Sequence, residues 1–326
     1  MRVVLAPDKL RGTYTAAEAA AALARGWRAV RPEDEPVELP LADGGEGTAA
    51  AILAARGGEW REAQVHDALG RPCTARFARL IDGSAALDVA EACGAARVAD
   101  RPRDPLAASS RGAGELVRAA IEDGALNVVV GVGGTASTDG GVGLRDGLGP
   151  VPADVELVAA LDVQNPLLGP DGAAAAFGPQ KGASAEQVAE LEERLRSLDL
   201  PTAGRPGAGA GGGIGGMLML LGAAAVSGAE LVAAEVGLAA ALRHAGLCVT
   251  AEGRIDRQTL SGKTVAHVAD ICRAARVQCI AVGGVVEPGA AEELARRGCE
   301  THEQGDLERA GRELASRWHS SSSPSG

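Results

Sequence analysis

The chain opens with Val3-Val-Leu-Ala-Pro-Asp-Lys-Leu-Arg-Gly12, an apolar run of strand length that stops at a proline and a polar loop. Thr15 and Glu18 then have the spacing of a capping box, which predicts a helix to about residue 28. A second apolar run, at residues 37–41, ends in Ala42-Asp-Gly-Gly-Glu-Gly-Thr48 and leads into an alanine-rich helix. These repeated strand–loop–helix units predict an α/β fold with a parallel sheet, whose functional loops follow the carboxyl ends of the strands.

The domain organisation follows from two changes in this pattern. Between residues 62 and 89 shorter strands and turns replace the alternation, which resumes near residue 247. We therefore expect one α/β domain built from residues 1–88 and 247–319, with residues 89–246 inserted into it as a second α/β domain. Residues 320–326 are serine-rich and of low complexity, and we expect them to form a disordered tail.

Composition narrows the class of protein. Hydrophobic residues make up 46% of the chain and charged residues 23%, which is typical of a soluble globular protein. A net charge of −11 argues against nucleic acid or an anionic membrane as a partner, and 2% aromatic residues argue against base-stacking platforms. Residues 206–229 carry no charge, but their dense apolar part is far shorter than the roughly 20 residues of a membrane span.

Cysteine and lysine usage add two expectations. The six cysteines form no CxxC pair and the sequence begins without a secretory signal, so we expect reduced thiols and a cytoplasmic protein. The 32 basic residues include only three lysines, Lys9, Lys181 and Lys263, each in a turn-rich motif. Because a compact ammonium is not equivalent to a guanidinium, we expect these three lysines to be functional.

The glycine-rich segment Gly133-Gly-Thr-Ala-Ser-Thr-Asp-Gly-Gly141 follows a strand of β-branched residues. Glycines permit positive φ angles and close approach of the backbone, so successive N–H groups can converge on an anion. The hydroxyls of this segment add donors, and Asp139 adds a carboxylate that can hold Mg²⁺ or accept a proton. We interpret the segment as a phosphate-binding loop; the alternative is an ordinary glycine-rich turn between a strand and a helix.

A second glycine-rich segment, Gly207-Ala-Gly-Ala-Gly-Gly-Gly-Ile-Gly-Gly216, precedes an apolar helix. It is either an anion seat at a helix N-terminus or a place of close packing or hinge motion, and both interpretations remain open. Since no strand precedes it and no acid follows at the required distance, a dinucleotide-binding motif is not favoured.

Acidic and basic side chains alternate in Thr250-Ala-Glu-Gly-Arg-Ile-Asp256, after a strand predicted at residues 247–250. The carboxylates suit a metal ion, and Arg254 suits a phosphate or a substrate carboxylate, with a structural ion-pair network as the alternative. The following Ser261-Gly-Lys-Thr264 resembles the end of a Walker A motif but lacks its first glycine, so a P-loop is excluded. Lys263 remains a candidate ligand contact.

Three more loops carry candidate residues. Asp8 with Lys9, and Asp43 with Glu46, lie at the ends of the first two strands, where a carboxylate can contact substrate or metal and Lys9 can neutralise an acidic ligand. Ser109-Ser-Arg111 precedes a helix and suits an anion. Helix capping is the alternative for each of these loops.

Taken in order, these segments resemble the bacterial glycerate kinase family of the first structural type. The matching segments span nearly the whole chain: Ala6-Pro-Asp-Lys, Ala42-Asp-Gly-Gly-Glu-Gly-Thr, Asp104-Pro-Leu, Ser109-Ser-Arg-Gly-Ala-Gly-Glu-Leu, Gly131-Val-Gly-Gly-Thr-Ala-Ser-Thr-Asp-Gly-Gly, Asp162-Val-Gln-Asn-Pro-Leu, Phe177-Gly-Pro-Gln-Lys-Gly-Ala, Pro206-Gly-Ala-Gly-Ala-Gly-Gly and Glu252-Gly-Arg-Ile-Asp.

The resemblance implies a kinase that uses ATP and Mg²⁺ to phosphorylate D-glycerate, to 2-phosphoglycerate or else to 3-phosphoglycerate. It also implies that the domain built from both chain ends is flavodoxin-like. We expect a monomer or a homodimer.

The resemblance also implies site residues. The nucleotide would contact Gly133, Gly134, Thr135, Ser137, Thr138, Gly140, Gly209 and Gly211; Mg²⁺ would contact Asp162, Glu252 and Asp256; catalysis would involve Lys9, Asp43, Asp139, Lys181 and Arg254; and the substrate would contact Asp8, Glu46, Ser110, Arg111, Asn165 and Lys263. Lys181 or Lys9 would neutralise the transferring group, Arg111 or Arg254 would bind the glycerate carboxylate, and Asp43 or Asp139 would orient the attacking hydroxyl.

The sequence departs from the family pattern at a few places. The family usually carries a longer glycine-rich segment where this chain has Gly149-Pro-Val-Pro-Ala-Asp154, the region after Gly284 is short, and Ala251 replaces a glycine. These departures motivate one alternative, a non-catalytic relative that binds nucleotide or organic acid as a sensor. A nicotinamide-dependent dehydrogenase is a second alternative that rests on the glycine loops alone.

Overall fold

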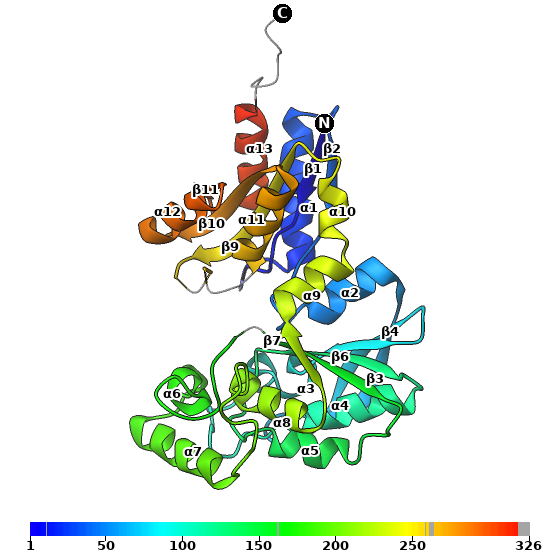
Figure 1. The fold of residues 1–326 in the computed structure, drawn as a ribbon, viewed down its shortest axis with the longest axis vertical. Coiled ribbons are helices and arrows are strands. Elements are labelled where there is room, and N and C mark those ends of the chain that lie inside the picture. The colour runs from blue at the N-terminus through cyan, green and yellow to red at the C-terminus, as the bar shows by residue number, and fades with distance from the viewer. Residues whose placement is uncertain (11, 162, 258, 261–263, 319–326) are drawn as a thin grey trace, which may run out of the picture. The chain divides into compact units, whose positions relative to one another are not determined.

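The computed structural model describes residues 1–10, 12–161, 163–257, 259–260 and 264–318 (Figure 1). The chain forms two compact units, which we call the first unit (Met1–Ala42 with Val232–Gly326) and the second unit (Asp43–Leu231). Asp162, Lys263 and the predicted tail lie outside the described residues.

The two units differ from the predicted domains at both boundaries. The second unit begins at Asp43 rather than at residue 89, because β3 (Gly58–His66) and β4 (Pro72–Leu80) pair with each other and β4 continues the sheet to β5 (Ala85–Asp88). It ends at Leu231, inside α9 (Gly228–Glu235), rather than at residue 246. Local strand patterns therefore placed the hairpin with the wrong sheet.

The first unit is a parallel five-stranded sheet in the order β11-β10-β9-β1-β2. Its strands are β1 (Arg2–Leu5), β2 (Glu35–Glu38), β9 (Leu247–Ile255), β10 (Gln278–Val286) and β11 (Cys299–Glu303). Numbered within the unit, this order reads 2-1-3-4-5 from the β2 edge, which is the flavodoxin-like order. Its topological switch point lies between β1 and β9, because the chain extends the sheet in opposite directions from these two neighbours.

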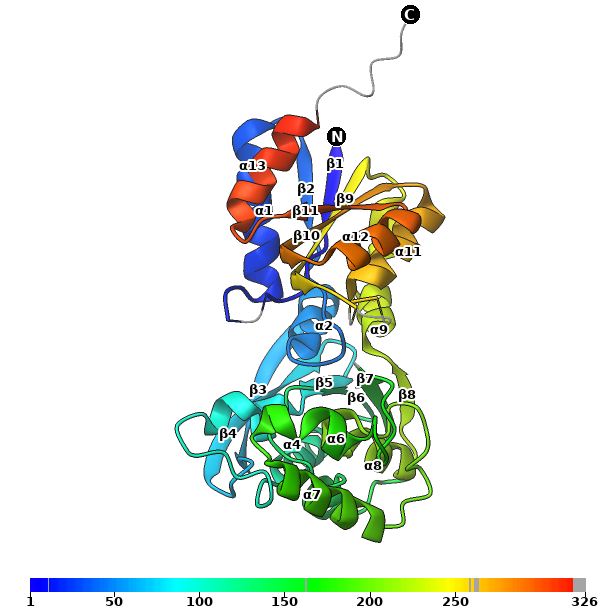
Figure 2. The same cartoon turned by 90° about the vertical axis from the view of Figure 1, so that its left-hand side faces the viewer.

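Helices cover both faces of this sheet (Figure 2). On one face α1 (Ala16–Val30) and α13 (Leu307–Arg317) pack side by side, and a Cβ at Gly26 would lie 2.0 Å from the Glu308 carbonyl oxygen. On the other face α11 (Thr264–Ala275) packs against β9 and β10. Thr15 caps α1 in the predicted box with Glu18. The remaining helices of this unit are α10 (Leu238–Leu242) and α12 (Pro288–Arg296).

The second unit is built on a mixed sheet in the order β3-β4-β5-β6-β7-β8. From β5 onward the pairing is parallel and includes β6 (Asn127–Val132), β7 (Glu156–Leu161) and β8 (Ala224–Ser227). The sequence pattern predicts a helix to about residue 225, but α8 (Ile214–Leu220) ends earlier and β8 adds an edge strand beside β7. The short connection at Gly149 is a turn that closes with a hydrogen bond from the Val155 N–H to the Pro152 carbonyl.

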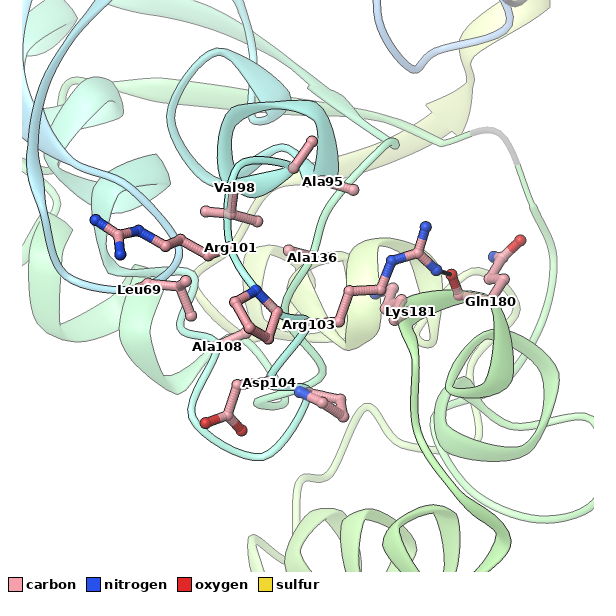
Figure 3. Close-up of a pocket in the computed structure, with 13 residues that line it drawn as sticks. Leu69, Ala95, Val98, Arg101, Arg103, Asp104, Ala108, Ala136, Gln180 and Lys181 are labelled. Carbon is pink, nitrogen blue, oxygen red and sulfur yellow. Dashed lines mark hydrogen bonds between the residues drawn. The ribbon is translucent and has the colours of Figure 1, made fainter.

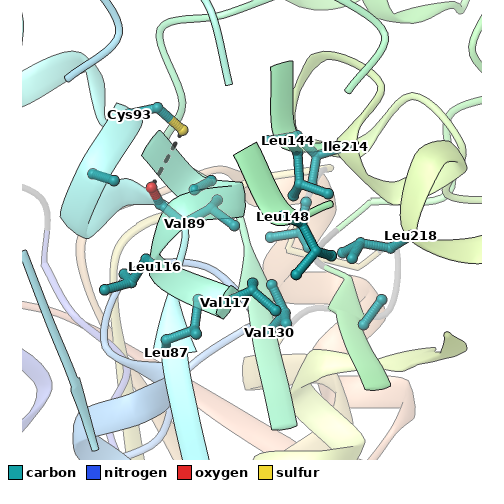
Figure 4. Packing of buried hydrophobic residues seen from close by; sticks show 14 of the residues in the cluster. Leu87, Val89, Cys93, Leu116, Val117, Val130, Leu144, Leu148, Ile214 and Leu218 are labelled. Atoms are coloured by element: carbon teal, nitrogen blue, oxygen red, sulfur yellow. Dashed lines mark hydrogen bonds between the residues drawn. The ribbon is translucent and has the colours of Figure 1, made fainter. Parts of the chain in front are cut away.

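The core of the second unit packs helices against this sheet (Figure 4). Leu87 and Val130 come from β5 and β6, Leu116 from α4 (Arg111–Glu122), and Leu144 from α5 (Val142–Leu148). The other helical segments are α2 (Thr48–Arg56), α3 (Ala90–Cys93), η1 (Ala95–Val98), α6 (Ala173–Phe177), η2 (Pro179–Lys181), α7 (Ala185–Ser197) and η3 (Ala210–Gly212).

In the part of the chain that the structure describes, no helix is both long enough and apolar enough to cross a membrane.

Candidate active site

The glycine-rich loop after β6 is a compact turn with buried hydroxyls. Thr135, Ser137 and Thr138 are at most 5% exposed. Among the described residues, the Ser137 Oγ and Thr138 Oγ1 atoms are buried and have no hydrogen-bond partner. A buried hydroxyl without a partner costs free energy of folding. The two hydroxyls of this loop therefore have hydrogen-bonding capacity that the fold itself does not use.

Asp139 holds this loop together. Its Oδ2 accepts hydrogen bonds from the Ser110 N–H at 2.8 Å, the Ser110 hydroxyl at 2.9 Å and the Gly143 N–H at 3.2 Å. Its Oδ1 accepts from the Gly141 N–H at 3.1 Å. Because both oxygens accept bonds inside the fold, Asp139 is placed to position the loop rather than to accept a substrate proton.

Ser110 has a structural role in the same cluster. It is 0% exposed, and its hydroxyl accepts from the Leu144 N–H at 2.8 Å while it donates to Asp139. The sequence-based expectation of a substrate contact at Ser110 therefore conflicts with its burial.

Lys181 lies against the loop from η2. Its ammonium donates to the Thr135 hydroxyl at 3.1 Å and to the Ser137 carbonyl oxygen. The side chain is only partly buried. The fold thus brings the positive charge of Lys181 to the glycine-rich loop, although Lys181 and Thr135 are 46 residues apart in the sequence.

A second loop, residues 43–47, lies beside the first one. A Cβ at Gly45 would lie 3.5 Å from the Gly133 Cα, and one at Gly134 would lie 2.5 Å from the Glu46 Oε1. Asp43 is 7% exposed, and its Oδ1 accepts from the Gly45 N–H at 3.2 Å. Asp43, Glu46, Gly133 and Gly134 therefore share one edge of the second unit.

Asp88 is a residue that the sequence analysis missed. It ends β5, is 7% exposed, and accepts from the Gly47 N–H at 2.8 Å and the Ala49 N–H at 3.0 Å. Through these bonds it anchors the loop that carries Asp43 at the start of α2. The sequence does carry a signal, because Asp88 directly follows the apolar run at residues 85–87.

Two predicted substrate contacts are engaged elsewhere in the second unit. Arg111 Nε donates to Glu115 at 3.0 Å, and the same carboxylate accepts from the His66 N–H at 2.9 Å. Burial raises the pKa of Glu115, but the hydrogen bonds from His66 and Arg111 outweigh it and leave the pKa below its usual value. Asn165 donates from Nδ2 to the Asp171 carbonyl at 2.7 Å and so stabilises its own loop.

The second glycine-rich segment serves close packing. A Cβ at Gly209 would lie 2.3 Å from the Pro166 carbonyl oxygen, and one at Gly211 would lie 2.7 Å from the Val132 Cγ1. Gly140 in the first glycine-rich loop is closely packed as well, since an added Cβ would lie 2.3 Å from the Leu198 Cδ1. Close packing therefore explains why these three positions are glycine, and we do not include them in the phosphate-binding site.

In the first unit, Asp8 and Lys9 follow β1 at the switch point of the sheet. Asp8 is 5% exposed, and its Oδ2 accepts from the Thr264 hydroxyl at 2.8 Å. The Lys9 ammonium lies 3.7 Å from the Asp8 Oδ1. Ligands of open α/β sheets bind past the carboxyl ends of strands at such a point, so the position of this pair fits a binding role.

The acidic motif of the first unit lies on β9 and just after it. The structure corrects the predicted end of this strand, because β9 continues to Ile255 and places Glu252 and Arg254 within it. The Thr259 hydroxyl donates to Glu252 at 2.9 Å and accepts from the Asp256 N–H at 3.1 Å, which draws the two acids together. Arg254 donates to Glu287 at 2.7 Å, and this bond raises the pKa of Arg254.

Comparison with known proteins identifies the chain's relatives. A model of the glycerate kinase family matches residues 3–154 and 145–304. The glycerate 2-kinase of Escherichia coli (strain K12) is 36% identical over 324 residues, which cover 87% of this chain and 85% of that protein. The chain belongs to the glycerate kinase family.

Other glycerate kinases agree with this membership. The glycerate kinase of Bacillus subtilis (strain 168) is 35% identical over 326 residues and covers 88% of this chain and 85% of its own. The crystal structure of a putative glycerate kinase 2 from Salmonella typhimurium LT2 has a TM-score of 0.77 and 31% identity, covering 97% of this chain and 98% of that one. The predicted enzyme class, a glycerate kinase that transfers a phosphoryl group to an alcohol, is confirmed, as is the α/β fold class.

Proposed function

We propose that this glycerate kinase transfers the γ-phosphoryl group of ATP to D-glycerate, with Mg²⁺, and that the product is 2-phosphoglycerate. The observation that carries the proposal is the Lys181 ammonium fixed on the glycine-rich loop by the Thr135 hydroxyl at 3.1 Å. Catalysis of phosphoryl transfer consists largely of positioning and charge neutralisation, and an ammonium fixed on a glycine-rich loop suits both.

In the second unit, the phosphate seat consists of Gly133, Gly134 and Thr135. Gly134 has φ +69°, a conformation that favours glycine, and the Glu46 side chain lies where a Gly134 Cβ would be. Lys181 neutralises the charge of the transferring group. Asp139 positions the loop, so the role of orienting the attacking hydroxyl falls to Asp43.

The first unit offers oxygen donors that fit Mg²⁺. Mg²⁺ in kinases is typically held by one or two carboxylates together with substrate phosphates and water. Glu252 and Asp256, linked through Thr259, supply such a pair, and within the described residues no group of three or more metal-binding side chains exists. Bound Mg²⁺ supplies charge neutralisation at the phosphate oxygens. Asp162, the third predicted ligand, lies outside the described residues.

Of the two arginines expected to bind the glycerate carboxylate, Arg254 is the better candidate. Its partner Glu287 is 40% exposed, and an exposed ion pair of this kind contributes at most about 1 kcal/mol. Arg111 instead pairs with Glu115, whose side chain is 7% exposed and also bonds His66. Breaking the Arg111 pair would leave a buried carboxylate with one donor fewer, which costs more.

The test is an assay of ADP release from ATP with D-glycerate, with L-glycerate and with no acceptor, each with Mg²⁺ or with excess EDTA. We expect turnover that requires both D-glycerate and Mg²⁺, with phosphorus NMR identifying 2-phosphoglycerate. A 3-phosphoglycerate signal would correct the product alone. Nucleotide binding without any turnover would contradict the proposal and favour a sensor.

A further inference from the structure

A pocket with an aliphatic wall and a cationic rim opens on the second unit (Figure 3). Its volume is about 130 Å³. Leu69, Val98 and Ala108 form part of the wall, and Arg103 and Lys181 lie on the rim. This volume is slightly less than the roughly 150 Å³ of a closed cavity that holds benzene, but the pocket is open, so a planar ring can enter it with part of the ring outside.

The pocket and the phosphate seat are parts of one piece of structure. Ala95, on the pocket wall, donates from its N–H to the Gly134 carbonyl at 2.9 Å, and the Ala136 N–H donates to the Cys93 carbonyl at 2.9 Å. Lys181 both lines the pocket and bonds Thr135 of the glycine-rich loop. A ligand that fills the pocket can therefore extend along Lys181 to the seat.

The Arg103 side chain is held at the edge of this pocket. Its Nη1 donates to the Gln180 carbonyl at 2.7 Å. Its stem packs over Gly182, where an added Cβ would lie 2.8 Å from the Arg103 Cβ and which has φ +96°. A guanidinium fixed in this way offers a flat surface, and guanidinium planes stack on aromatic rings.

The lining chemistry selects between the two substrates of a kinase. D-glycerate is covered with hydroxyl and carboxylate oxygens, which would find few hydrogen-bond partners on a wall of leucine, valine, proline and alanine. The charged lining residues are Arg101, Arg103 and Lys181 against a single acid, Asp104, whose Oδ1 accepts from the Ala107 N–H at 3.1 Å. The lining suits a flat, uncharged ring with an anionic tail.

We propose that this pocket binds the base of the nucleoside triphosphate, between the aliphatic wall and the Arg103 guanidinium, with the phosphates directed along Lys181 to Gly133 and Gly134. This inference rests on the proposed kinase function. The chain is almost free of aromatic residues, and the inference gives it a base-binding site with an aliphatic wall. Arg103 becomes a nucleotide contact that the sequence motifs do not indicate.

The experiment compares ADP with inorganic tripolyphosphate, which carries phosphates and no base, by calorimetric titration. Ala95→Leu crowds the pocket and Arg103→Ala removes the flat surface. We expect each variant to weaken ADP binding about tenfold, as for loss of base stacking, while tripolyphosphate binding changes less than about twofold. Ala96→Leu is the matched control, since Ala96 is the exposed neighbour of Ala95 in η1 and does not line the pocket.

Each remaining outcome contradicts the inference. Unchanged ADP affinity in both variants, with D-glycerate-dependent turnover in the parent protein, would overturn the base site and leave the kinase function standing. Equal loss of ADP and tripolyphosphate binding, or an equal effect of Ala96→Leu, would mean that the pocket does not hold the base. Failure of the parent protein both to bind ADP and to turn over would overturn the function as well.

Discussion

The Lys181 ammonium lies 3.1 Å from the Thr135 hydroxyl, and it also donates to the Ser137 carbonyl oxygen. These bonds fix a flexible side chain at the loop that we assign to phosphate binding. An ammonium held in this way loses little further freedom when an anion arrives, so its charge acts on the transferring group at a low entropic cost.

Replacing Lys181 by alanine is expected to lower kcat about 100-fold, because a fixed charge that stabilises the transition state is lost. Lys181→Arg should recover only a small part of the lost kcat, since a forked guanidinium cannot place its charge where a compact ammonium does. The measurement is steady-state kinetics with ATP and D-glycerate varied separately.

The matched control is Arg118→Ala, which removes an exposed cation on α4 whose partner is Glu122. Its kcat should stay within about twofold of the parent value, because a surface ion pair contributes little. Full activity of Lys181→Ala would remove Lys181 from the mechanism.

Asp139→Asn is expected to destabilise the second unit by about 2 kcal/mol, because an amide NH₂ would face N–H and O–H donors that now bond a carboxylate. Urea unfolding monitored by circular dichroism measures this loss. Ser110→Ala should also destabilise this unit, since it removes one donor to Asp139 and the acceptor of the Leu144 N–H. A variant as stable as the parent but without activity would instead identify Asp139 as the base.

The sequence predicted the architecture where local signals agree with the tertiary fold. The capping box of Thr15 and Glu18 and the strand–loop–helix pattern around β1 and β2 are both local, and both are present in the structure. The hairpin at residues 58–80 was assigned to the wrong unit, because its place depends on pairing between β4 and β5 that no local pattern encodes.

The sequence indicates which residues are candidates for the site better than it indicates what each residue does. The sequence points to Lys181 and to the loop at Gly133 because lysines are rare and glycines are clustered in it. The burial of Ser110 and the packing of Gly209 were not predictable, since both depend on which atoms of distant segments occupy the space around them. The sequence gives no indication of the role that we propose for Arg103, because one arginine among 29 carries no compositional signal.

Arg254→Ala should raise the KM for D-glycerate at least about tenfold with little change in the KM for ATP, because it removes the proposed partner of the acceptor carboxylate. Stability should change little, since Arg254 is itself exposed in its pairs with Glu287 and Asp256. Glu287→Ala is the control and should leave the KM for D-glycerate unchanged. Equal effects of the two variants would reduce the role of Arg254 to its ion pair.

Apart from Cys73, the native thiols should be nearly inert to a disulfide reagent such as DTNB at pH 8. Burial raises the pKa of Cys93 to about 12, and Cys248, Cys279 and Cys299 form a buried row across β9, β10 and β11. Hydrogen bonds with Cys248 and Cys279 lower the pKa of Cys272, but Cys272 is 0% exposed, so the reagent does not reach it. Cys73 is half-buried, so we expect it to react first. In Cys73→Ser the fast phase should disappear until urea is added, whereas a remaining fast phase would show that the buried row is accessible.

The stabilisation that ionised Asp34 gives the first unit should be lost in acid. Burial raises its pKa, but hydrogen bonds that include those from Arg31 at 2.6 Å and Trp27 at 3.0 Å outweigh burial and lower the pKa to about 2. Since the folded-state pKa is lower than the unfolded value of 3.8, the contribution is full above about pH 4 and is lost as the pH falls toward 2.

Asp34→Asn is therefore expected to lower the free energy of unfolding by about 2 kcal/mol at pH 7, and by progressively less as the pH is lowered from 4 to 2. Urea unfolding of a Trp60→Phe background, in which Trp27 and Trp318 report the first unit, measures the difference at each pH. Glu33→Gln is the control, because Glu33 is exposed and also pairs with Arg31, at 3.2 Å. A cost for Asp34→Asn that does not vary with pH would show that its hydrogen bonds, rather than its ionisation, stabilise the unit.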